Sequence, residues 1–113
     1  MPKRILIVED DALIAMALAQ DIEDAGFHVA GPCINVVQAL HTLEMHSIDA
    51  AILDVNLGNE TSEQIAIALI SAQIPFVVAS GYGDDALPGA LIGAPKLDKP
   101  LQLDQVIAFL ESC

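Results

Sequence analysis

The chain has 113 residues, more than half of them apolar, and carries 4 basic against 16 acidic side chains, a net charge of −12 at pH 7. Its length predicts one domain with a substantial core, spanning 1–113. The acidic balance argues against binding to nucleic acid or to anionic membranes, because both need Lys and Arg to neutralise phosphates. It leaves open a bare acidic surface, a divalent cation site or a basic protein partner.

Several observations favour a cytoplasmic protein with free thiols. Cys33 and Cys113 lie far apart and form no CxxC motif. Only four apolar residues follow Lys3 and Arg4, too few for a signal peptide, and no apolar run has the length of a membrane span. A zinc site is not expected, because no i, i+4 pairing links the three histidines, His28, His41 and His46.

Short apolar runs alternate with amphipathic stretches along the chain. In chain order the pattern predicts a strand at 5–8, a helix at 11–25, an edge-like strand at 27–33, a helix at 35–46, a strand at 50–53, a helix at 62–72, strands at 76–79 and 94–97, and a helix at 101–110. The apolar side chains expected on the inner helix faces are Ile14, Leu18 and Ile22, then Val36, Leu40 and Leu43, and finally Leu103, Val106, Ile107 and Leu110.

The segment between the last two strands, SGYGDDALPGALIGAPKLDK, has four glycines and two prolines. A long helix is not expected here, since Gly and Pro cost about 1 and 3 kcal/mol relative to Ala. One or two turns at 84–87, interrupted by Pro88 and Gly89, are expected in its place.

Five strands that alternate with helices imply right-handed crossovers and a parallel sheet covered on both faces. Ligand sites in such sheets lie beyond the carboxyl ends of the strands. The residues found there are the acidic run 9–11, Asp54, Ser80 and Lys99.

These strand-end groups suit one kind of chemistry. Carboxylates from the first and third strands converge and repel one another, and Mg²⁺ relieves that repulsion while accepting oxygen ligands. Lys99 adds a positive charge and Ser80 a hydroxyl. A carboxylate held among a metal, an ammonium and a hydroxyl is suited to accept a phosphoryl group. Asp11 is predicted to cap the first helix instead of joining the metal site.

The motifs ILIVEDD, AAILDVNLG, FVVASGYG and KLDKP occur in that order, and with them the chain resembles the response-regulator receiver domains of two-component signalling. The resemblance covers essentially the whole chain. It implies a flavodoxin-like α/β fold with a doubly wound five-stranded parallel sheet in the order 2-1-3-4-5 and a short or irregular fourth helix.

The resemblance also implies roles for individual residues. Asp54 accepts a phosphoryl group from a histidine of a sensor histidine kinase or of a phosphotransfer protein. Asp10 binds Mg²⁺ directly, Glu9 holds its water molecules, and the main-chain carbonyl of Asn56 completes the protein ligands.

Two further residues then contact the phosphoryl group. Ser80 hydrogen-bonds one of its oxygens and reports phosphorylation, and Lys99 pairs with another. The peptide bond from Lys99 to Pro100 is expected to be cis, which X-Pro bonds adopt at low cost.

The chain departs from the receiver pattern at the switch. Receivers usually carry Tyr or Phe three residues before the lysine, and here Lys96 stands in that place. An aromatic residue, Tyr82, follows Ser80 instead, so Tyr82 or Lys96 is the candidate switch. The run PFVVASGYG resembles the FATGUY subgroup, which implies a stand-alone receiver serving HWE- or HisKA2-type kinases as a regulator, shuttle or sink.

Two other classes of function remain open at this point. Haloacid-dehalogenase-type phosphohydrolases also form an aspartyl phosphate with Mg²⁺, but their second acid lies two residues after the nucleophile, where this chain has Asn56. A non-phosphorylated interaction module would keep the same residues idle. The expectation is a signalling domain, not an enzyme.

Overall fold

The computed structural model describes residues 2–81 and 89–113. Its main strands are β1 (Arg4–Val8), β2 (His28–Cys33), β3 (Ala50–Asp54), β6 (Phe76–Ser80) and β7 (Lys96–Asp98). They form one parallel sheet in the order β2-β1-β3-β6-β7, which places β2 and β7 at the edges. This is the 2-1-3-4-5 order expected of the flavodoxin-like fold.

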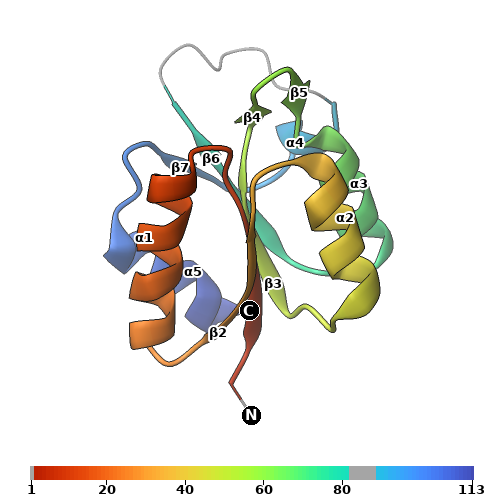
Figure 1. The fold of residues 1–113 in the computed structure, drawn as a ribbon. Coiled ribbons are helices and arrows are strands. Elements are labelled where there is room, and N and C mark those ends of the chain that lie inside the picture. Colours follow the sequence, from red (N-terminus) through yellow and green to blue (C-terminus); the bar gives the residue numbers. More distant parts are fainter. Residues whose placement is uncertain (1, 82–88) are drawn as a thin grey trace.

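Helices cover both faces of the sheet (Figure 1). One face packs against α1 (Ala12–Asp24) and α5 (Leu103–Ser112). The other packs against α2 (Val36–Met45), α3 (Glu63–Ser71) and α4 (Gly89–Ile92). The fourth helix has four residues, which confirms the short helix expected from the Gly- and Pro-rich segment.

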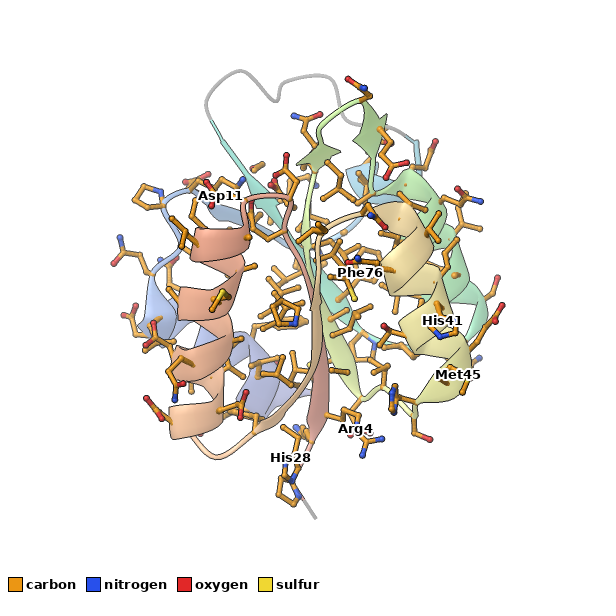
Figure 2. The ribbon with its side chains drawn as sticks, in the orientation of Figure 1. Arg4, Asp11, His28, His41, Met45 and Phe76 are labelled. Carbon is orange, nitrogen blue, oxygen red and sulfur yellow. The ribbon has the colours of Figure 1, made fainter. Side chains whose placement is uncertain are left out.

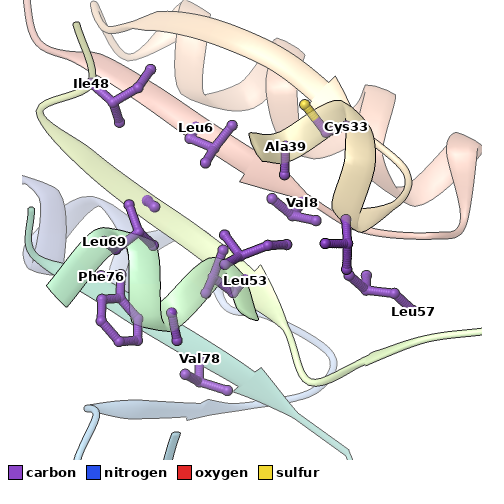
Figure 3. Close-up of a cluster of buried hydrophobic side chains, with 14 of the residues drawn as sticks. Leu6, Val8, Cys33, Ala39, Ile48, Leu53, Leu57, Leu69, Phe76 and Val78 are labelled. Carbon is purple, nitrogen blue, oxygen red and sulfur yellow. The ribbon is translucent and has the colours of Figure 1, made fainter. Parts of the chain in front are cut away.

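Alternating side chains of the central strands supply two cores. In β1, Leu6 and Val8 point toward α2 and α3, while Ile5 and Ile7 point toward α1 and α5. β3 and β6 alternate in the same way, because successive residues of a strand face opposite sides of the sheet. Figure 3 shows the first core, where Leu53, Phe76 and Val78 pack beneath Ala39 and Leu69 of the helices. Strands buried on both faces explain the continuous apolar runs of the sequence.

Two side chains predicted to face inward are exposed. Ile14 on α1 is 54% exposed and Leu103 on α5 is 41% exposed. In α1 the buried positions next to Ile22 are the small residues Ala15 and Ala19, which let the helix approach the sheet closely. Leu103 begins α5, ahead of the turns that bury Val106 and Leu110. The other predicted inward residues are buried or half-buried against the two cores: Leu18, Ile22, Val36, Leu40, Leu43, Val106, Ile107 and Leu110.

The last strand begins two residues later than predicted, at Lys96 instead of at 94. Pro95 has no N–H to donate, and its carbonyl accepts the N–H of Val78 at 2.9 Å, so the ladder of paired residues starts beyond it. Gly89 is the first described residue of α4, and Glu63 Oε2 accepts the N–H of Ala90 at 3.1 Å. The turns predicted at 84–87, Pro88 and Tyr82 lie outside the described residues.

A small hairpin after β3 was not predicted. It consists of β4 (Asn56–Leu57) and β5 (Glu60–Thr61), joined by Gly58, which has φ +71°, and Asn59. The Gly-Asn pair is a recognised signal for a two-residue hairpin turn. Its flanking strands have two residues each, too short to show a period in the sequence.

Candidate functional site

The predicted site residues come together at the carboxyl edge of the sheet. Glu9 and Asp10 follow β1, Asp54 ends β3, Ser80 ends β6 and Lys99 follows β7. Parallel strands bring these ends to the same edge, so residues up to 90 positions apart in sequence become neighbours.

Three carboxylates form the centre of the site. Glu9, Asp10 and Asp54 each place one carboxylate oxygen within 4.8 Å of the others. Glu9 and Asp54 are buried, with 6% and 4% of their surface exposed, while Asp10 is exposed to solvent. Within residues 2–81 and 89–113, this is the group of acids, histidines or cysteines whose spacing could hold a metal ion. Oxygen donors with one side open to water are what Mg²⁺ prefers, so these residues fit that ion.

Lys99 neutralises part of this negative charge. Its Nζ lies 2.7 Å from Asp54 Oδ1 and 3.6 Å from Glu9 Oε2. Burial lowers the pKa of Lys99, but the hydrogen bond and charge of Asp54, followed by those of Glu9, outweigh burial and leave the pKa raised. The ammonium therefore stays protonated against the acceptor carboxylate.

The main chain holds Lys99 in place. Its N–H donates to the Ser80 carbonyl at 2.9 Å, and the peptide bond to Pro100 is cis, as predicted. Ser80 itself is half-buried at the end of β6. The structure thus brings Ser80 and Lys99 to adjacent strand ends beside Asp54.

Glu9 carries the clearest electrostatic signal of the site. Its pKa is raised from 4.5 to about 7, first by burial and then by the charge and hydrogen bond of Asp54. The N–H of Asp11, which donates to Glu9 Oε1 at 3.2 Å, and the charge of Lys99 oppose this shift. Burial of the Glu9 carboxyl is thus the main cause of its raised pKa, and the charge of Asp54 adds to it. A divalent cation beside Glu9 would favour the charged form of this carboxyl.

Asp11 is separate from the metal cluster. Its Oδ1 accepts the N–H groups of Leu13 at 3.0 Å and Ile14 at 3.2 Å, which caps α1 as predicted. The run of three acids therefore serves two purposes: Glu9 and Asp10 belong to the site, and Asp11 begins the helix.

Asn56 lies at the start of the hairpin, two residues after Asp54. The hairpin is tied to α2 by Glu60, whose Oε1 accepts the N–H of Val36 at 2.9 Å. No pattern in the sequence pointed to Glu60, because its partner lies 24 residues away and belongs to another helix end.

The two candidate switch residues are placed differently. Lys96 is exposed, and its Nζ donates to the carbonyls of Ile92 at 2.8 Å and Ala94 at 2.9 Å, so it is engaged with the end of α4. Tyr82 lies outside the described residues.

A cleft of about 530 Å³ opens beside the acids. Glu9 and Lys99 line one end, and Ile14 and Leu18 of α1 line a wall that faces Leu101. The exposed Ile14, which the helical pattern had placed in the core, therefore lines this cleft.

A search of the helices in the described part of the chain found none that is both long and apolar enough to cross a membrane.

The profile of the response regulator receiver domain family matches residues 5–111. The chain is 30% identical over 115 aligned residues to the transcriptional regulatory protein PdtaR of Mycobacterium tuberculosis, covering 98% of this chain and 56% of that protein. It therefore spans about half the length of that curated relative.

Two solved structures resemble the fold over nearly the whole chain. SdrG from Sphingomonas melonis Fr1 is 43% identical with a TM-score of 0.82, covering 98% of this chain and 95% of that one. The second is a response regulator protein from Burkholderia pseudomallei, which was solved with a phosphorylated aspartic acid, a calcium ion and citrate. It is 25% identical with a TM-score of 0.84, and the match covers 96% of this chain and 66% of that one. With the family match over residues 5–111, the chain belongs to the response regulator receiver domains of two-component signalling.

Proposed function

We propose that Asp54 accepts a phosphoryl group from a phosphohistidine, in a reaction that depends on Mg²⁺. The observation that carries the proposal is the buried Asp54 carboxylate, which lies 2.7 Å from Lys99 Nζ and within the three-acid cluster. The Burkholderia pseudomallei relative supports it, because that structure combines a phosphorylated aspartic acid with a divalent cation.

The transfer breaks the P–N bond of the donor and forms a P–O bond to Asp54. The histidine leaves as a neutral imidazole once its ring nitrogen has taken a proton, and Asp54 becomes an acyl phosphate. A bound Mg²⁺ would neutralise charge on the phosphoryl oxygens. Asp10, Asp54 and the Asn56 carbonyl would hold the ion, and Glu9 would hold its water molecules.

Lys99 and Ser80 act on the product. The Lys99 ammonium, now paired with Asp54 Oδ1, pairs with a phosphoryl oxygen once the acceptor is modified. The Ser80 hydroxyl, at the adjacent strand end, donates to another oxygen. Phosphorylation then replaces one carboxylate charge by a larger one beside Ser80 and Lys99, which changes the electrostatics of these two strand ends.

The surface of α1 suits a helical donor. Leu13, Ile14 and Met16 are 79%, 54% and 63% exposed, and Ile14 borders the cleft that ends at Glu9 and Lys99. A four-helix phosphotransfer domain or kinase dimerisation bundle packing on this face would bring its histidine to the acceptor. The HWE or HisKA2 kinases implied by the FATGUY resemblance are the proposed class, with this receiver as a stand-alone regulator, shuttle or sink.

We further propose that the chain signals and is not a turnover enzyme. A phosphohydrolase of the haloacid-dehalogenase kind needs a second acid two residues after the nucleophile, and here that residue is Asn56. Steady hydrolysis of a phosphate ester at enzyme-like rates would contradict this proposal.

The test is incubation with a small phosphodonor such as acetyl phosphate, with and without Mg²⁺, followed by intact-mass measurement. The wild type should gain one acid-labile phosphate only with the metal. Asp54→Asn should gain none. Asp104→Asn, which changes an exposed acid on α5, is the matched control and should behave as wild type. Equal labelling of wild type and Asp54→Asn would refute the acceptor assignment.

A further inference from the structure

A second polar pocket lies at the opposite edge of the sheet from the acids. It has a volume of about 330 Å³ and is lined by Arg4, His28, His46 and the main chain of β2 from Val29 to Gly31. Figure 2 shows Arg4 and His28 together at this edge, with Asp11 at the other. β1 rises about 3.3 Å per residue, so roughly 16 Å separates Arg4 from Glu9. The two sites are therefore distinct.

The cationic groups in this pocket come from three different places in the chain. Arg4 begins β1, His28 begins β2, and His46 follows α2. Only the parallel topology brings them together, because the amino ends of β1 and β2 are neighbours and the loop before β3 passes beside them.

Arg4 differs from the other basic residues in having no internal partner for its charge. Lys3 donates to the carbonyls of Leu110 and Cys113, Lys96 donates to carbonyls at the end of α4, and Lys99 pairs with Asp54. Among the described residues, the guanidinium of Arg4 has neither a hydrogen-bond nor an ion-pair partner.

Asp49, which contacts the main chain of Arg4, does not neutralise the charge of the guanidinium. Asp49 Oδ2 accepts the main-chain N–H of Arg4 at 2.8 Å, and its carboxylate forms no ion pair with the guanidinium. A chain with 16 acidic side chains thus leaves its single arginine free to take an external partner.

We propose that this pocket binds a small phosphate-bearing ligand, either inorganic phosphate or a phosphomonoester. A guanidinium matches phosphate with two parallel hydrogen bonds, and two imidazoles on other sides of the pocket can donate to its remaining oxygens. A carboxylate ligand has two oxygens, and the guanidinium would bind both of them without the imidazoles. The volume lies at the lower end of the roughly 300–1,000 Å³ of small-molecule pockets, which suits a small ion or a compact ester.

The charge of the whole chain makes such binding specific to this place. A net charge of −12 repels anions in general, so saturable anion binding requires a local group of positive charges. This inference does not depend on the proposed phosphorylation of Asp54.

The experiment is a residue-resolved NMR titration of the metal-free protein with inorganic phosphate and, separately, with glycerol 3-phosphate. The amides of Val29, Ala30 and Gly31, which line the pocket, should shift and saturate. Tighter binding of glycerol 3-phosphate would identify a phosphomonoester as the natural class, and tighter binding of phosphate would identify the free ion.

Substitutions of exposed residues test the pocket and provide a control. Arg4→Gln should raise the dissociation constant by about tenfold or more, because a hydrogen bond to a charged group contributes about 1.5–3 kcal/mol. The double variant His28→Ala/His46→Ala should also raise the dissociation constant, because it removes two donor side chains that line the pocket. His41→Gln changes an exposed histidine of α2 that points away from the pocket and should leave binding unchanged (Figure 2).

Three results would overturn the proposal. The first is the absence of saturable shifts in the pocket, and the second is shifts confined to the neighbourhood of Lys99. The third is binding of Zn²⁺ at His28 and His46 without any response to phosphate, which would make the pocket a metal site.

Discussion

At the residue scale, the acceptor site is defined by an imbalance of charge. Two buried carboxylates, Glu9 and Asp54, share one lysine that lies 2.7 Å from the second and 3.6 Å from the first. The pKa of Glu9 is raised to about 7, mainly by burial and further by the charge of Asp54. The site therefore binds a cation best when Glu9 has lost its proton.

Binding of Mg²⁺ should depend on pH. Below about pH 7, Glu9 holds a proton that the metal must displace, so the apparent affinity should rise as the pH increases from about 5.5 to 7 and level off above. Glu9→Gln should bind more weakly and lose this dependence. Calorimetric titration with Mg²⁺ at several pH values tests the prediction, and an unchanged pH profile in Glu9→Gln would contradict it.

The stability of the metal-free protein should change in the opposite direction. The pKa of Glu9 is higher in the folded state than its ordinary value of 4.5, so folding favours the protonated form. This contribution is fully present below about pH 4.5 and is lost as the pH rises through about 7, with an upper limit of about 3 kcal/mol. Urea unfolding in EDTA across this range measures it. Glu9→Gln should show a smaller loss of stability over the same interval.

The division of the acidic run can be tested residue by residue. Asp11→Ala should lower the free energy of unfolding by about 1 kcal/mol, because α1 loses its cap, and should leave Mg²⁺ affinity nearly unchanged. Asp10→Asn should weaken Mg²⁺ binding and leave the free energy of unfolding nearly unchanged, since Asp10 is exposed and makes no such cap. Asp11→Asn is the matched control because asparagine caps as well as aspartate. Loss of metal binding in Asp11→Ala would place Asp11 in the site.

At the scale of elements, a contact between the hairpin and a distant helix helps to hold the segment after the acceptor. The hairpin β4–β5 carries Asn56 at its first position, and Glu60 in β5 fastens it to the first turn of α2 through the N–H of Val36. A carboxylate at a helix N-terminus is also favoured by the helix dipole. The hairpin that carries Asn56 is therefore tied to a helix whose first turn lies 24 residues earlier in the chain.

Removing this contact should loosen the hairpin. Glu60→Ala should lower the free energy of unfolding by about 1 kcal/mol and weaken Mg²⁺ binding a few-fold, because the Asn56 carbonyl loses its fixed position. Glu44→Gln, in the last turn of α2, is the control and should be neutral or slightly stabilising. Equal Mg²⁺ affinity in Glu60→Ala and wild type would show that the hairpin is held by other contacts.

At the scale of the whole molecule, the sheet separates two polar edges. Its carboxyl edge gathers the acids and Lys99, and its amino edge gathers Arg4 with His28 and His46 (Figure 2). The buried strands between them form two continuous cores. In a protein of net charge −12, the three-acid cluster and the single arginine thus lie at opposite ends of β1.

Mg²⁺ should stabilise the whole domain by mass action. A ligand that binds only the folded state adds stability of about 2.7 kcal/mol at a hundredfold excess over its dissociation constant. The melting temperature of wild type should therefore rise with Mg²⁺ above the value in NaCl at the same ionic strength, and EDTA should reverse the rise. The melting temperature of Asp10→Asn should be the same in Mg²⁺ as in NaCl at the same ionic strength. An equal rise in that variant would mean that the ion only screens the acidic surface.

The sequence by itself determined the strand and helix order, the parallel sheet and the set of residues at its carboxyl edge. Those features rest on local information: apolar runs, a helix cap such as Asp11, and the polar residue that follows each of several strands. The tertiary structure alone decided what depends on contacts distant in sequence. Examples are the exposure of Ile14, the Glu60 contact to α2, the Glu63 contact to α4, and the pocket around Arg4. Periodicity reports which face of an element is apolar, but it carries no information on which side chains of other elements meet there.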